Sequence, residues 1–176
     1  KHLKFSFIIQ EEAKGLGHAI LCAKSNIDQE YFVVVLPDDL MLARKPAIGE
    51  MLKRYEQHPG IYLAVEKVAK KLKSYYGIAD LSAHGAVDSQ TFLVENIIEK
   101  PSANESSSNF AVVGRYILTR KIFEALTNTM PGALGELQLT DGIRNLLGHI
   151  PIYAYKFSGK RYDCGNPLGV HRASLE

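Results

Sequence analysis

The sequence lacks the features of a nucleic-acid-binding protein or a metal-cluster protein. Among its 176 residues, 21 Lys and Arg nearly balance 19 Asp and Glu, which leaves a net charge of +2. That charge is too small, and the basic residues are too scattered, to predict nucleic acid as a partner. The two cysteines, Cys22 and Cys164, form neither a CxxC pair nor a metal-binding spacing. We therefore expect free thiols in a reducing compartment, with small molecules as the partners.

Long apolar stretches are missing as well. No run approaches the roughly 20 apolar residues that span a bilayer, and no signal peptide is visible. We therefore expect a cytoplasmic protein with no membrane partner. The chain has no initiator Met, and residues 1–4 lead directly into a strand-like segment, so we expect it to begin within a longer protein.

What the sequence does contain is a core and alternating elements. Hydrophobic residues make up 46%, which suits a domain with a core of its own. The apolar pattern predicts strands at residues 3–9, 31–36, 61–65, 78–81, 92–99, 111–118 and 152–157. It predicts helices at residues 19–24, 46–58, 119–127 and 139–147, and one more after Pro167. Neither a repeat nor a linker is visible, so we expect residues 1–176 to form a single domain.

This alternation favours a three-layer α/β/α Rossmann-like fold with a mixed, mainly parallel sheet. The apolar run YFVVVL at residues 31–36 is typical of a parallel strand buried on both faces. Residues 75–118 are richer in strands, and we expect them to add a small antiparallel part beside the main sheet. Ligands of open α/β sheets bind beyond the carboxyl ends of the strands, where several unusual residues of this chain fall.

The connecting segments also carry expectations. His84 and Gly85 are predicted to lie in a turn between two strands, and residues 101–109 in a surface loop. Thr119 is a candidate N-cap, residues 159–165 are expected to be a polar loop, and the basic run 67–73 is expected to be a solvated face. The histidines form no ligand-like pairs, so we interpret them as structural or surface residues: His18, His58, His84, His149 and His171.

Asp38 and Asp39 follow the apolar run at its carboxyl end. Adjacent side chains on extended backbone point in opposite directions. One carboxylate can therefore face a ligand while the other holds the loop. A single carboxylate together with phosphate oxygens is an ordinary magnesium site. The alternative is that an Asp in this turn only caps a helix.

Glu99, Lys100 and Pro101 end another predicted strand. A carboxylate accepts hydrogen bonds from hydroxyls, and an ammonium binds a phosphate as a point charge. Together they suit a sugar phosphate. An exposed Glu–Lys pair at a strand end is also common in proteins, so this motif does not decide the matter.

Glycines and one further carboxylate complete the candidates. Gly15, in GLGH at a helix start, could let the backbone approach a ligand closely, although the motif is neither GxGxxG nor a phosphate-binding P-loop. Gly77 and Gly114, in or beside strands, mark either close approach to a ligand or a bulge. Asp163, in RYDCG, is either a second metal carboxylate or a turn residue.

The order of these motifs is more specific than any one of them. The chain contains, in sequence, Gln10, GLGHA, LPDDL, YYGI, EKP, NFAVVGRYIL, GELQLTD and RYDCG. This series resembles the sugar nucleotidyltransferases, and most closely the bacterial UTP–glucose-1-phosphate uridylyltransferases. The resemblance covers essentially the whole chain. The related thymidylyltransferases share the plan but carry a glycine where this chain has Pro37.

The resemblance implies roles for the nucleotide side of the site. Gln10 matches a glutamine whose amide can pair with the uracil edge, and Gly15 matches a residue whose backbone contacts the base. Asp38 matches the aspartate that binds Mg²⁺ and the nucleotide, and Asp163 matches the second metal carboxylate. Asp38, Lys100 and Asp163 are thereby the residues expected to support catalysis.

The resemblance also implies roles for the sugar side. Gly77 and the stretch from Val112 to Gly114 match backbone contacts to the sugar. Glu99 matches the residue that accepts hydrogen bonds from sugar hydroxyls, and Lys100 matches the lysine that binds the sugar phosphate. Glu136 lies in a subfamily signature near the site and is assigned a lesser part.

The implied reaction joins UTP and glucose 1-phosphate to give UDP-glucose and pyrophosphate. The site must bring two polyanions together and neutralise charge in the transition state, which a Mg²⁺ ion and a lysine can do. The partners implied are therefore these two small molecules. A homo-oligomer is expected for the full-length protein.

Two parts of the family pattern are missing. The Gly-rich GxGTRxxPxTK loop that wraps the triphosphate is absent, and the helix after Gly165 is short. We expect the chain by itself to be inactive or nearly so, and we expect an open sheet edge to favour association.

Other functions remain open at this stage. Gln10 can bind either pyrimidine, so a glucose-1-phosphate thymidylyltransferase is the nearest enzymatic alternative. A non-catalytic paralogue that binds sugar nucleotides is the alternative from another class, which the presence of Asp38, Lys100 and Asp163 disfavours. A dinucleotide-binding domain is disfavoured by the lack of GxGxxG after a strand.

Overall fold

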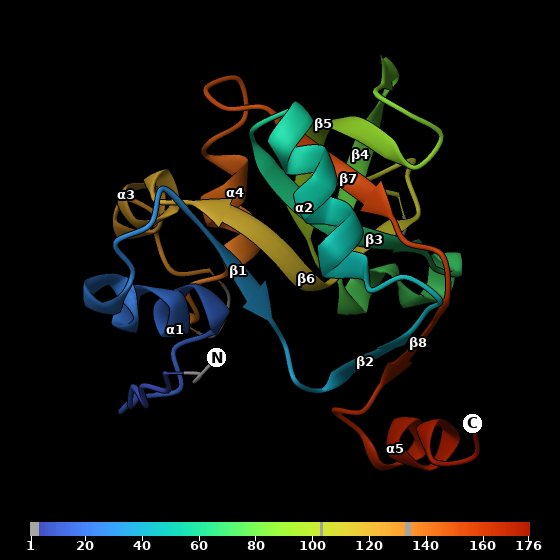
Figure 1. The fold of residues 1–176 in the computed structure, drawn as a ribbon, viewed down its shortest axis with the longest axis horizontal. Helices are drawn as coiled ribbons and strands as arrows, with labels where there is room; N and C mark the ends of the chain where they lie inside the picture. The colour runs from blue at the N-terminus through green and yellow to red at the C-terminus, as the bar shows by residue number, and fades with distance from the viewer. Residues whose placement is uncertain (1–3, 103, 133–134) are drawn as a thin grey trace.

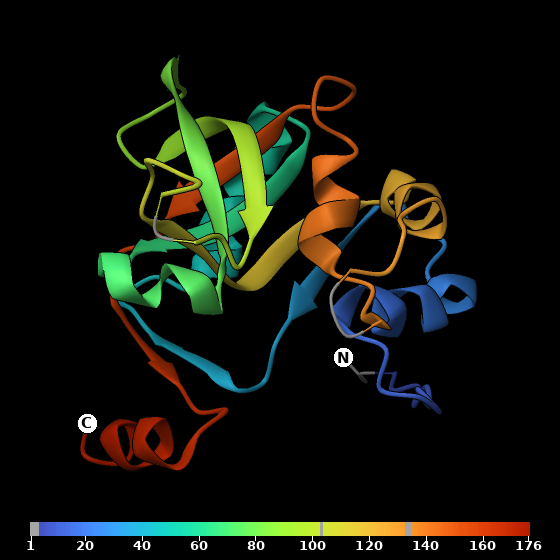
Figure 2. The ribbon, with the colours of Figure 1, turned by 180° about the vertical axis from the view of Figure 1, so that it is seen from behind.

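A six-stranded mixed sheet forms the centre of the computed structural model, which describes residues 4–102, 104–132 and 135–176 (Figures 1 and 2). The strands lie in the order β1 (Tyr31–Val35), β6 (Phe110–Thr119), β3 (Ile61–Lys67), β7 (Ile152–Lys156), β5 (Thr91–Glu99) and β4 (Gly77–Ala86). The strands predicted from the sequence at these positions are confirmed.

Both strand directions occur in this sheet. β3 and β7 pair in parallel, with Ile61 opposite Ile152, and the other pairings are antiparallel. As a result β1, β3, β7 and β4 run in one direction, whereas β6 and β5 run in the other. The predicted mixed α/β fold is confirmed. The antiparallel strands do not all lie beside the main sheet, because β6 lies inside it, between β1 and β3.

Helices pack on both faces of the sheet. On one face lie α1 (Leu16–Cys22), α3 (Lys121–Thr127) and α4 (Leu139–Arg144), and on the other lies α2 (Ala47–Gln57), in front of the sheet in Figure 1. Helices cover both faces because successive residues of β3 point to opposite sides of the sheet. Leu63 belongs to the apolar core on the side of α1, α3 and α4, and Tyr62 belongs to the core on the side of α2. Each fully buried large apolar side chain stabilises the fold by about 1.5–3 kcal/mol. Within the described part of the chain, no helix combines the length and hydropathy that a membrane span requires.

β1 is an edge strand, contrary to the prediction that it is buried on both faces. Its pairing partner is β6, and its exposure alternates along the strand. Phe32 packs against the core, whereas Val33 and Val35 are 36% and 50% exposed. The continuous apolar run was misleading because periodicity cannot distinguish an apolar edge strand from a central one.

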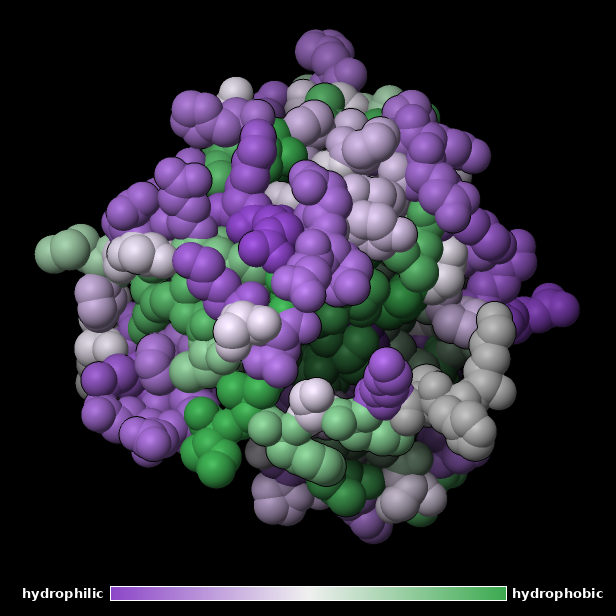
Figure 3. Space-filling model, turned by 60° about the vertical axis from the view of Figure 1, so that its left-hand side comes forward, coloured by the Kyte–Doolittle hydropathy of each residue, from purple (hydrophilic) through white to green (hydrophobic). Residues whose placement is uncertain are grey.

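The strand predicted at residues 3–9 is not present over residues 4–9, which take no regular structure; Leu3 lies outside the described residues. Phe5, Phe7 and Ile9 are 77%, 96% and 80% exposed. Figure 3 shows apolar surface open to solvent on this side of the molecule. Local alternation alone does not form a strand, because its backbone groups need a paired neighbour.

A separate two-stranded sheet carries the chain's last segment. β2 (Asp39–Leu42) pairs with β8 (Lys160–Asp163), and α5 (Pro167–Ala173) follows, below the main sheet in Figure 1. The prediction of a polar loop at residues 159–165 is therefore wrong for residues 160–163, which form β8. The sequence KRYD is too short and too polar for its alternation to stand out. α5 was predicted, and the Asn166 side chain caps it by accepting a hydrogen bond from the Gly169 amide at 2.9 Å.

Three smaller predictions were wrong. His84 and Gly85 lie within β4 rather than in a turn. Thr119 ends β6, and α3 begins at Lys121 without a side-chain cap. In the basic run 67–73, which contains part of the 3₁₀ helix η2 (Lys70–Tyr75), Lys73 is buried rather than solvated.

The loop predicted at residues 101–109 is present, with Ala103 outside the described residues. A second short 3₁₀ helix, η1 (Lys24–Asn26), follows α1.

Candidate active site

A small cavity at the end of β5 brings together Gly77, Glu99 and Val112. β4 begins at Gly77 and β5 ends at Glu99, and the two residues are register partners in the antiparallel pair. Val112 enters from β6, whose Ala111 pairs with Ile78 of β4. The cavity has a volume of about 180 Å³, and its other walls are Leu16, Leu36, Tyr75, Tyr76, Tyr116, Gln138, Leu139 and Thr140. The strand pairing thus joins three predicted sugar-binding positions that are distant in sequence.

Glu99 is the acidic group of this cavity. Its side chain is 18% exposed. Burial raises the pKa of its carboxyl, and this effect outweighs the hydrogen bond from Thr140 and the charge of Lys100, which both lower the pKa. The negative charges of Asp141 and Glu136 raise the pKa further. A partly desolvated carboxylate in a cavity is suited to accept hydrogen bonds from ligand hydroxyls.

Gly77 has to be a glycine for steric reasons. A Cβ at this position would lie 2.9 Å from Thr140 Oγ1 and 3.1 Å from Glu99 Oε2. The missing side chain therefore lets Thr140 and Glu99 meet over the backbone of β4.

Lys100 has a left-handed backbone with a φ of 45°, which no other non-glycine residue of the described part shows. Such a conformation costs roughly 1–3 kcal/mol and is concentrated at functional sites. The Lys100 amide donates to the carbonyl of Tyr76 at 3.0 Å. Its Nζ lies 3.9 Å from Glu99 Oε1, and the side chain is 53% exposed. A cation and a carboxylate therefore stand together at the cavity.

The paired aspartates differ in their surroundings: Asp39 holds the loop, and the ligand-facing role of Asp38 stays a prediction. Asp39 is buried, and its carboxylate accepts hydrogen bonds from the Gly114 amide at 2.5 Å and from Arg161 Nε at 2.6 Å. Asp39 thus holds the loop, whereas Asp38 is exposed. The Asp38 carbonyl accepts a hydrogen bond from the Cys164 amide at 2.7 Å, which ties this loop to the segment after β8.

β8 brings Asp163 to Asp38. In the β2–β8 pair, Asp163 lies opposite Asp39. Asp38 Oδ2 and Asp163 Oδ1 lie 3.1 Å and 3.2 Å from the point where a Cβ on Gly165 would stand. The two carboxylates therefore flank one glycine. Within the described ranges, no group of three His, Cys, Asp or Glu is placed to hold a metal ion. A cation here would have two protein carboxylates, which is a common set for magnesium when water and phosphate oxygens supply the rest.

Both backbone polar groups of Gly114 make hydrogen bonds within the protein. Its amide donates to Asp39, and its carbonyl accepts from the Leu36 amide at 2.8 Å. A Cβ on Gly114 would lie 2.6 Å from Asp39 Oδ2. The glycine makes room for the aspartate, so the predicted backbone contact of Gly114 with a sugar stays a prediction.

Gln10, Gly15 and Glu136 form a third group beside the cavity. Gln10 Nε2 donates to the Gly15 carbonyl at 3.1 Å and lies 2.9 Å from His18 Nδ1. Gly15 has a φ of 91°, and a Cβ there would lie 2.8 Å from the Leu137 carbonyl and 3.2 Å from Glu136 Cβ. This group adjoins the cavity through two residues of the cavity wall. Leu16 follows Gly15 in the chain, and the Gln138 side chain donates a hydrogen bond to Glu136.

Residues 1–176 match the model of the family described as Nucleotidyl transferase. The chain belongs to the nucleotidyl transferase family. It is 40% identical, over 171 residues, to a UTP–glucose-1-phosphate uridylyltransferase of Staphylococcus haemolyticus, which covers 97% of this chain and 58% of that protein. A protein of the same name from Bacillus subtilis is also 40% identical, with 97% and 57% covered.

A solved structure with a similar fold is that of a UDP-glucose pyrophosphorylase complexed with UDP-glucose. It has 39% identity and a TM-score of 0.91, and the match covers 97% of this chain and 64% of that one. These findings confirm the resemblance drawn from the motifs. The chain spans less than two thirds of the length of these relatives.

Sequence reasoning missed three residues that shape the site of this nucleotidyl transferase chain. Arg161 is 7% exposed and bonds both Asp39 and Glu66 at 2.6 Å. Burial lowers the pKa of Arg161, but its bond to Tyr76 and the charges of Asp39 and Glu66 prevail and raise it. Tyr116 is buried in the cavity wall, and burial raises its pKa. Thr140 bonds Glu99. All three depend on long-range pairing that has no local signal.

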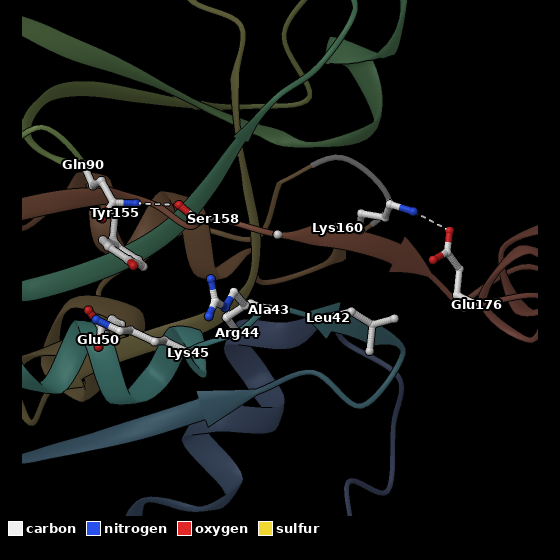
Figure 4. A pocket seen from close by; sticks show the side chains of 11 residues that line it. Leu42, Ala43, Arg44, Lys45, Glu50, Gln90, Tyr155, Ser158, Lys160 and Glu176 are labelled. Carbon is white, nitrogen blue, oxygen red and sulfur yellow. Dashed lines mark hydrogen bonds and ion pairs between the residues drawn. The ribbon is translucent and has the colours of Figure 1, made fainter.

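A larger cavity lies elsewhere in the described part of the nucleotidyl transferase chain, between the end of β2 and the end of β7 (Figure 4). It measures about 910 Å³ but contains none of the predicted residues. Its ionic contacts are internal, such as Lys160 Nζ with Glu176 Oε1 at 2.5 Å. The smaller cavity is the candidate active site, because a half-buried carboxyl with a raised pKa and a left-handed lysine lie together there.

Proposed function

We propose that this chain carries the sugar-phosphate site, the base site and the metal carboxylates of a UTP–glucose-1-phosphate uridylyltransferase. The reaction transfers the uridylyl group of UTP to glucose 1-phosphate and gives UDP-glucose and pyrophosphate. The observation that carries the proposal is the convergence of Gly77, Glu99 and Val112 on one small cavity with Lys100 at its edge. The names of the relatives support it.

The sugar phosphate occupies the small cavity. Glu99 accepts hydrogen bonds from sugar hydroxyls, and the Lys100 ammonium binds the phosphate. The backbone at Gly77 and at Val112–Gly114 contacts the sugar ring. Glu136 has a weaker role at this edge of the site, next to Gly15.

The nucleotide occupies the neighbouring group. The Gln10 side chain is oriented by the Gly15 carbonyl and by His18, so its amide is held toward one direction. Gln10 pairs with the uracil edge, and the Gly15 backbone contacts the base. An amide oriented by two neighbours loses less freedom on binding than a mobile one.

Asp38 and Asp163 fit a magnesium ion, because both carboxylates flank Gly165 and Asp39 is separately engaged with Arg161. When bound, magnesium neutralises phosphate charge and stabilises charge that develops in the transition state. The two aspartates are held at the β2–β8 pair, which is a sheet separate from the main one.

The chemistry follows from positioning. A phosphate oxygen of glucose 1-phosphate forms a bond to the α-phosphorus of UTP. The bond from that phosphorus to the bridging oxygen breaks, and the electron pair leaves with pyrophosphate. No covalent bond to the protein is needed. Lys100 holds the attacking phosphate, Glu99 fixes the sugar, and Gln10 fixes the base, so that the reactants meet in line.

A cytoplasmic location belongs to the same proposal. It is supported by Cys22 and Cys164, which are unpaired in the structure, as thiols are in a reducing compartment. A homo-oligomer of the full-length protein stays a prediction.

Titration calorimetry with UDP-glucose tests the proposal, because product binding does not require turnover. We expect the chain to bind UDP-glucose more tightly with magnesium than without it. The Asp38→Ala, Lys100→Ala double variant should lose that binding. The matched control is Lys53→Ala, Glu56→Ala, which likewise removes one cation and one carboxylate, both exposed on α2 and outside the cavity lining.

dTDP-glucose separates the proposal from the thymidylyltransferase alternative. Tighter binding of dTDP-glucose than of UDP-glucose would favour the alternative. A folded wild-type chain that binds neither compound would contradict the proposal.

A further inference from the structure

Lys73 is a buried charge with no part in the reaction as proposed so far. It is 3% exposed, and its Nζ donates to the Ser106 carbonyl at 2.5 Å. Its neighbours Lys70 and Lys71 in η2 are exposed. Burial of an ammonium is unfavourable unless it is hydrogen-bonded, so its position indicates a specific contact rather than packing alone.

The contact fastens the far end of the loop at residues 101–109. The Ser106 hydroxyl donates to Asp80 Oδ1 at 2.6 Å, and the Ser108 hydroxyl donates to the Ala79 carbonyl at 2.6 Å. Ser106 is thus held from two sides, by Lys73 of η2 and by Asp80 of β4. The positive charge of Lys73 is linked through Ser106 to a carboxylate.

The near end of the same loop begins at Lys100 and also leads back to Lys73. The Lys100 amide donates to the Tyr76 carbonyl at 3.0 Å, and the Tyr76 amide donates to the Lys73 carbonyl at 3.2 Å. The Lys73 side chain therefore bonds the far end of the loop directly, whereas its backbone is linked to the near end through Tyr76.

The backbone of Lys100 needs such support. A residue before a proline ordinarily takes an extended conformation, yet Lys100 precedes Pro101 with a φ of 45°. Neighbouring side chains on extended backbone point in opposite directions. The left-handed turn instead leaves Lys100 Nζ 3.9 Å from Glu99 Oε1, so both groups face the same ligand.

We propose that Lys73 is a positioning residue for the sugar-phosphate site, which clamps Ser106 to η2 and so holds Lys100 in its left-handed conformation beside Glu99. The role rests on the proposed function, in which Lys100 binds the phosphate of glucose 1-phosphate. Lys73 does not touch the ligand and acts through Lys100.

Amide hydrogen exchange tests the clamp without any ligand. Lys73→Met keeps the length of the side chain but removes the ammonium. It is expected to speed exchange at the Lys100 amide and to leave the amides of α2 unchanged. Lys71→Met, which makes the same charge change at an exposed position of η2, is the control and should have no effect. Unchanged exchange at Lys100 in folded Lys73→Met would overturn the proposal.

Ser106→Ala is a second test if Lys73→Met does not fold. It keeps Lys73 and the Ser106 carbonyl but removes the hydroxyl that bonds Asp80. Faster exchange at Lys100 is expected here as well. Protection equal to that of the wild type would count against a loop that fixes Lys100.

Titration with glucose 1-phosphate tests the role. Lys73→Met is expected to lower the affinity for glucose 1-phosphate by roughly tenfold or more, because a small displacement of a binding group is costly. Binding of uridine 5′-monophosphate should be unchanged, and Lys73→Arg should restore part of the loss. The double variant Lys73→Met, Lys100→Met should bind no more weakly than Lys100→Met alone.

The outcomes separate the two proposals. Equal weakening of both ligands, or additive effects in the double variant, would show a merely structural lysine and overturn the positioning role. A wild-type chain that binds no glucose 1-phosphate would instead overturn the proposed function, while hydrogen exchange would still report on the clamp.

Discussion

The ionised Glu99 carboxylate destabilises the folded chain. Burial raises its folded-state pKa, so the proton binds more tightly in the folded than in the unfolded chain. This favours the folded state below the ordinary carboxyl pKa of about 4.3 and is lost as the pH rises through the raised value. The ionised Glu99 therefore lowers the stability of the fold, a cost that its proposed role in binding would explain.

Glu99→Gln should therefore be more stable than the wild type at neutral pH, and its advantage should shrink in acid. Urea unfolding at neutral pH and near pH 4 checks the sign. The same variant should lose glucose 1-phosphate, because an amide accepts hydrogen bonds from hydroxyls less strongly than a carboxylate. A variant less stable than the wild type at neutral pH would show that the Thr140 and Lys100 contacts outweigh burial.

Gly77→Ala should destabilise the chain by about 1–3 kcal/mol, because the new Cβ would lie 2.9 Å from Thr140 Oγ1. Gly49→Ala is the matched control. A Cβ on Gly49 in α2 meets nothing within 4 Å, and alanine is the better helix former by roughly 1 kcal/mol. The two substitutions should change the free energy of unfolding in opposite directions, and the same sign in both would refute the steric argument.

At the scale of elements, the most buried ion pair of β8 joins Arg161 to Asp39 of β2. Arg161 and Asp39 are each 7% exposed and bond at 2.6 Å. Arg161→Met should cost roughly 3–5 kcal/mol, since it leaves the Asp39 charge buried without its partner. Lys160→Met, in the same strand but 65% exposed, should cost less than about 1 kcal/mol. Chemical denaturation of both variants measures the difference, and similar costs would argue against the pair as the anchor of β8.

α2 packs on the face of the sheet opposite to α1, α3 and α4. Met51 is fully buried against Tyr62 and Ile117. Met51→Ala should lower the free energy of unfolding by about 2–5 kcal/mol, yet leave the affinity for UDP-glucose unchanged below the unfolding transition. A weaker affinity in the folded variant would show that α2 is coupled to the site.

The elements could be predicted from the sequence where periodicity or turn chemistry is local. β3, β5, β6 and α2 fall close to their predicted bounds because each has a distinct apolar pattern. β8 could not be found, because four polar residues form a strand only when β2 lies beside them. The segment at residues 4–9 failed for the opposite reason, since it has the pattern of a strand without a paired neighbour in the structure.

At the scale of the molecule, the site was predicted as a set of residues but not as a geometry. The motif order supplied Glu99, Lys100, Asp38 and Asp163, and the fold places them in two groups, one at the small cavity and one beside Gly165. Gly114 is the instructive case. The structure engages both its backbone groups internally, which no local pattern indicates.

The exposed edge strand β1 predicts that the chain associates with other copies of itself. Its exposed face carries Tyr31, Val33 and Val35, and an open apolar edge can pair with another strand. Val33→Lys should reduce concentration-dependent association in sedimentation experiments. Val170→Lys, the same change on exposed α5, should not. Equal behaviour of the two variants would place the contact elsewhere.

The small volume of the candidate active-site cavity has a consequence for the proposed recognition of a sugar. A space of about 180 Å³ holds about six water molecules, since each takes roughly 30 Å³ in the liquid. If the proposed function holds, an incoming hexose would have to displace this solvent, and each hydroxyl would have to replace a hydrogen bond that a water molecule made. A deoxy sugar would leave the Glu99 carboxylate desolvated with only its bond from Thr140. Discrimination among hexoses would then come less from attraction to the correct sugar than from the desolvation that every incorrect one leaves uncompensated.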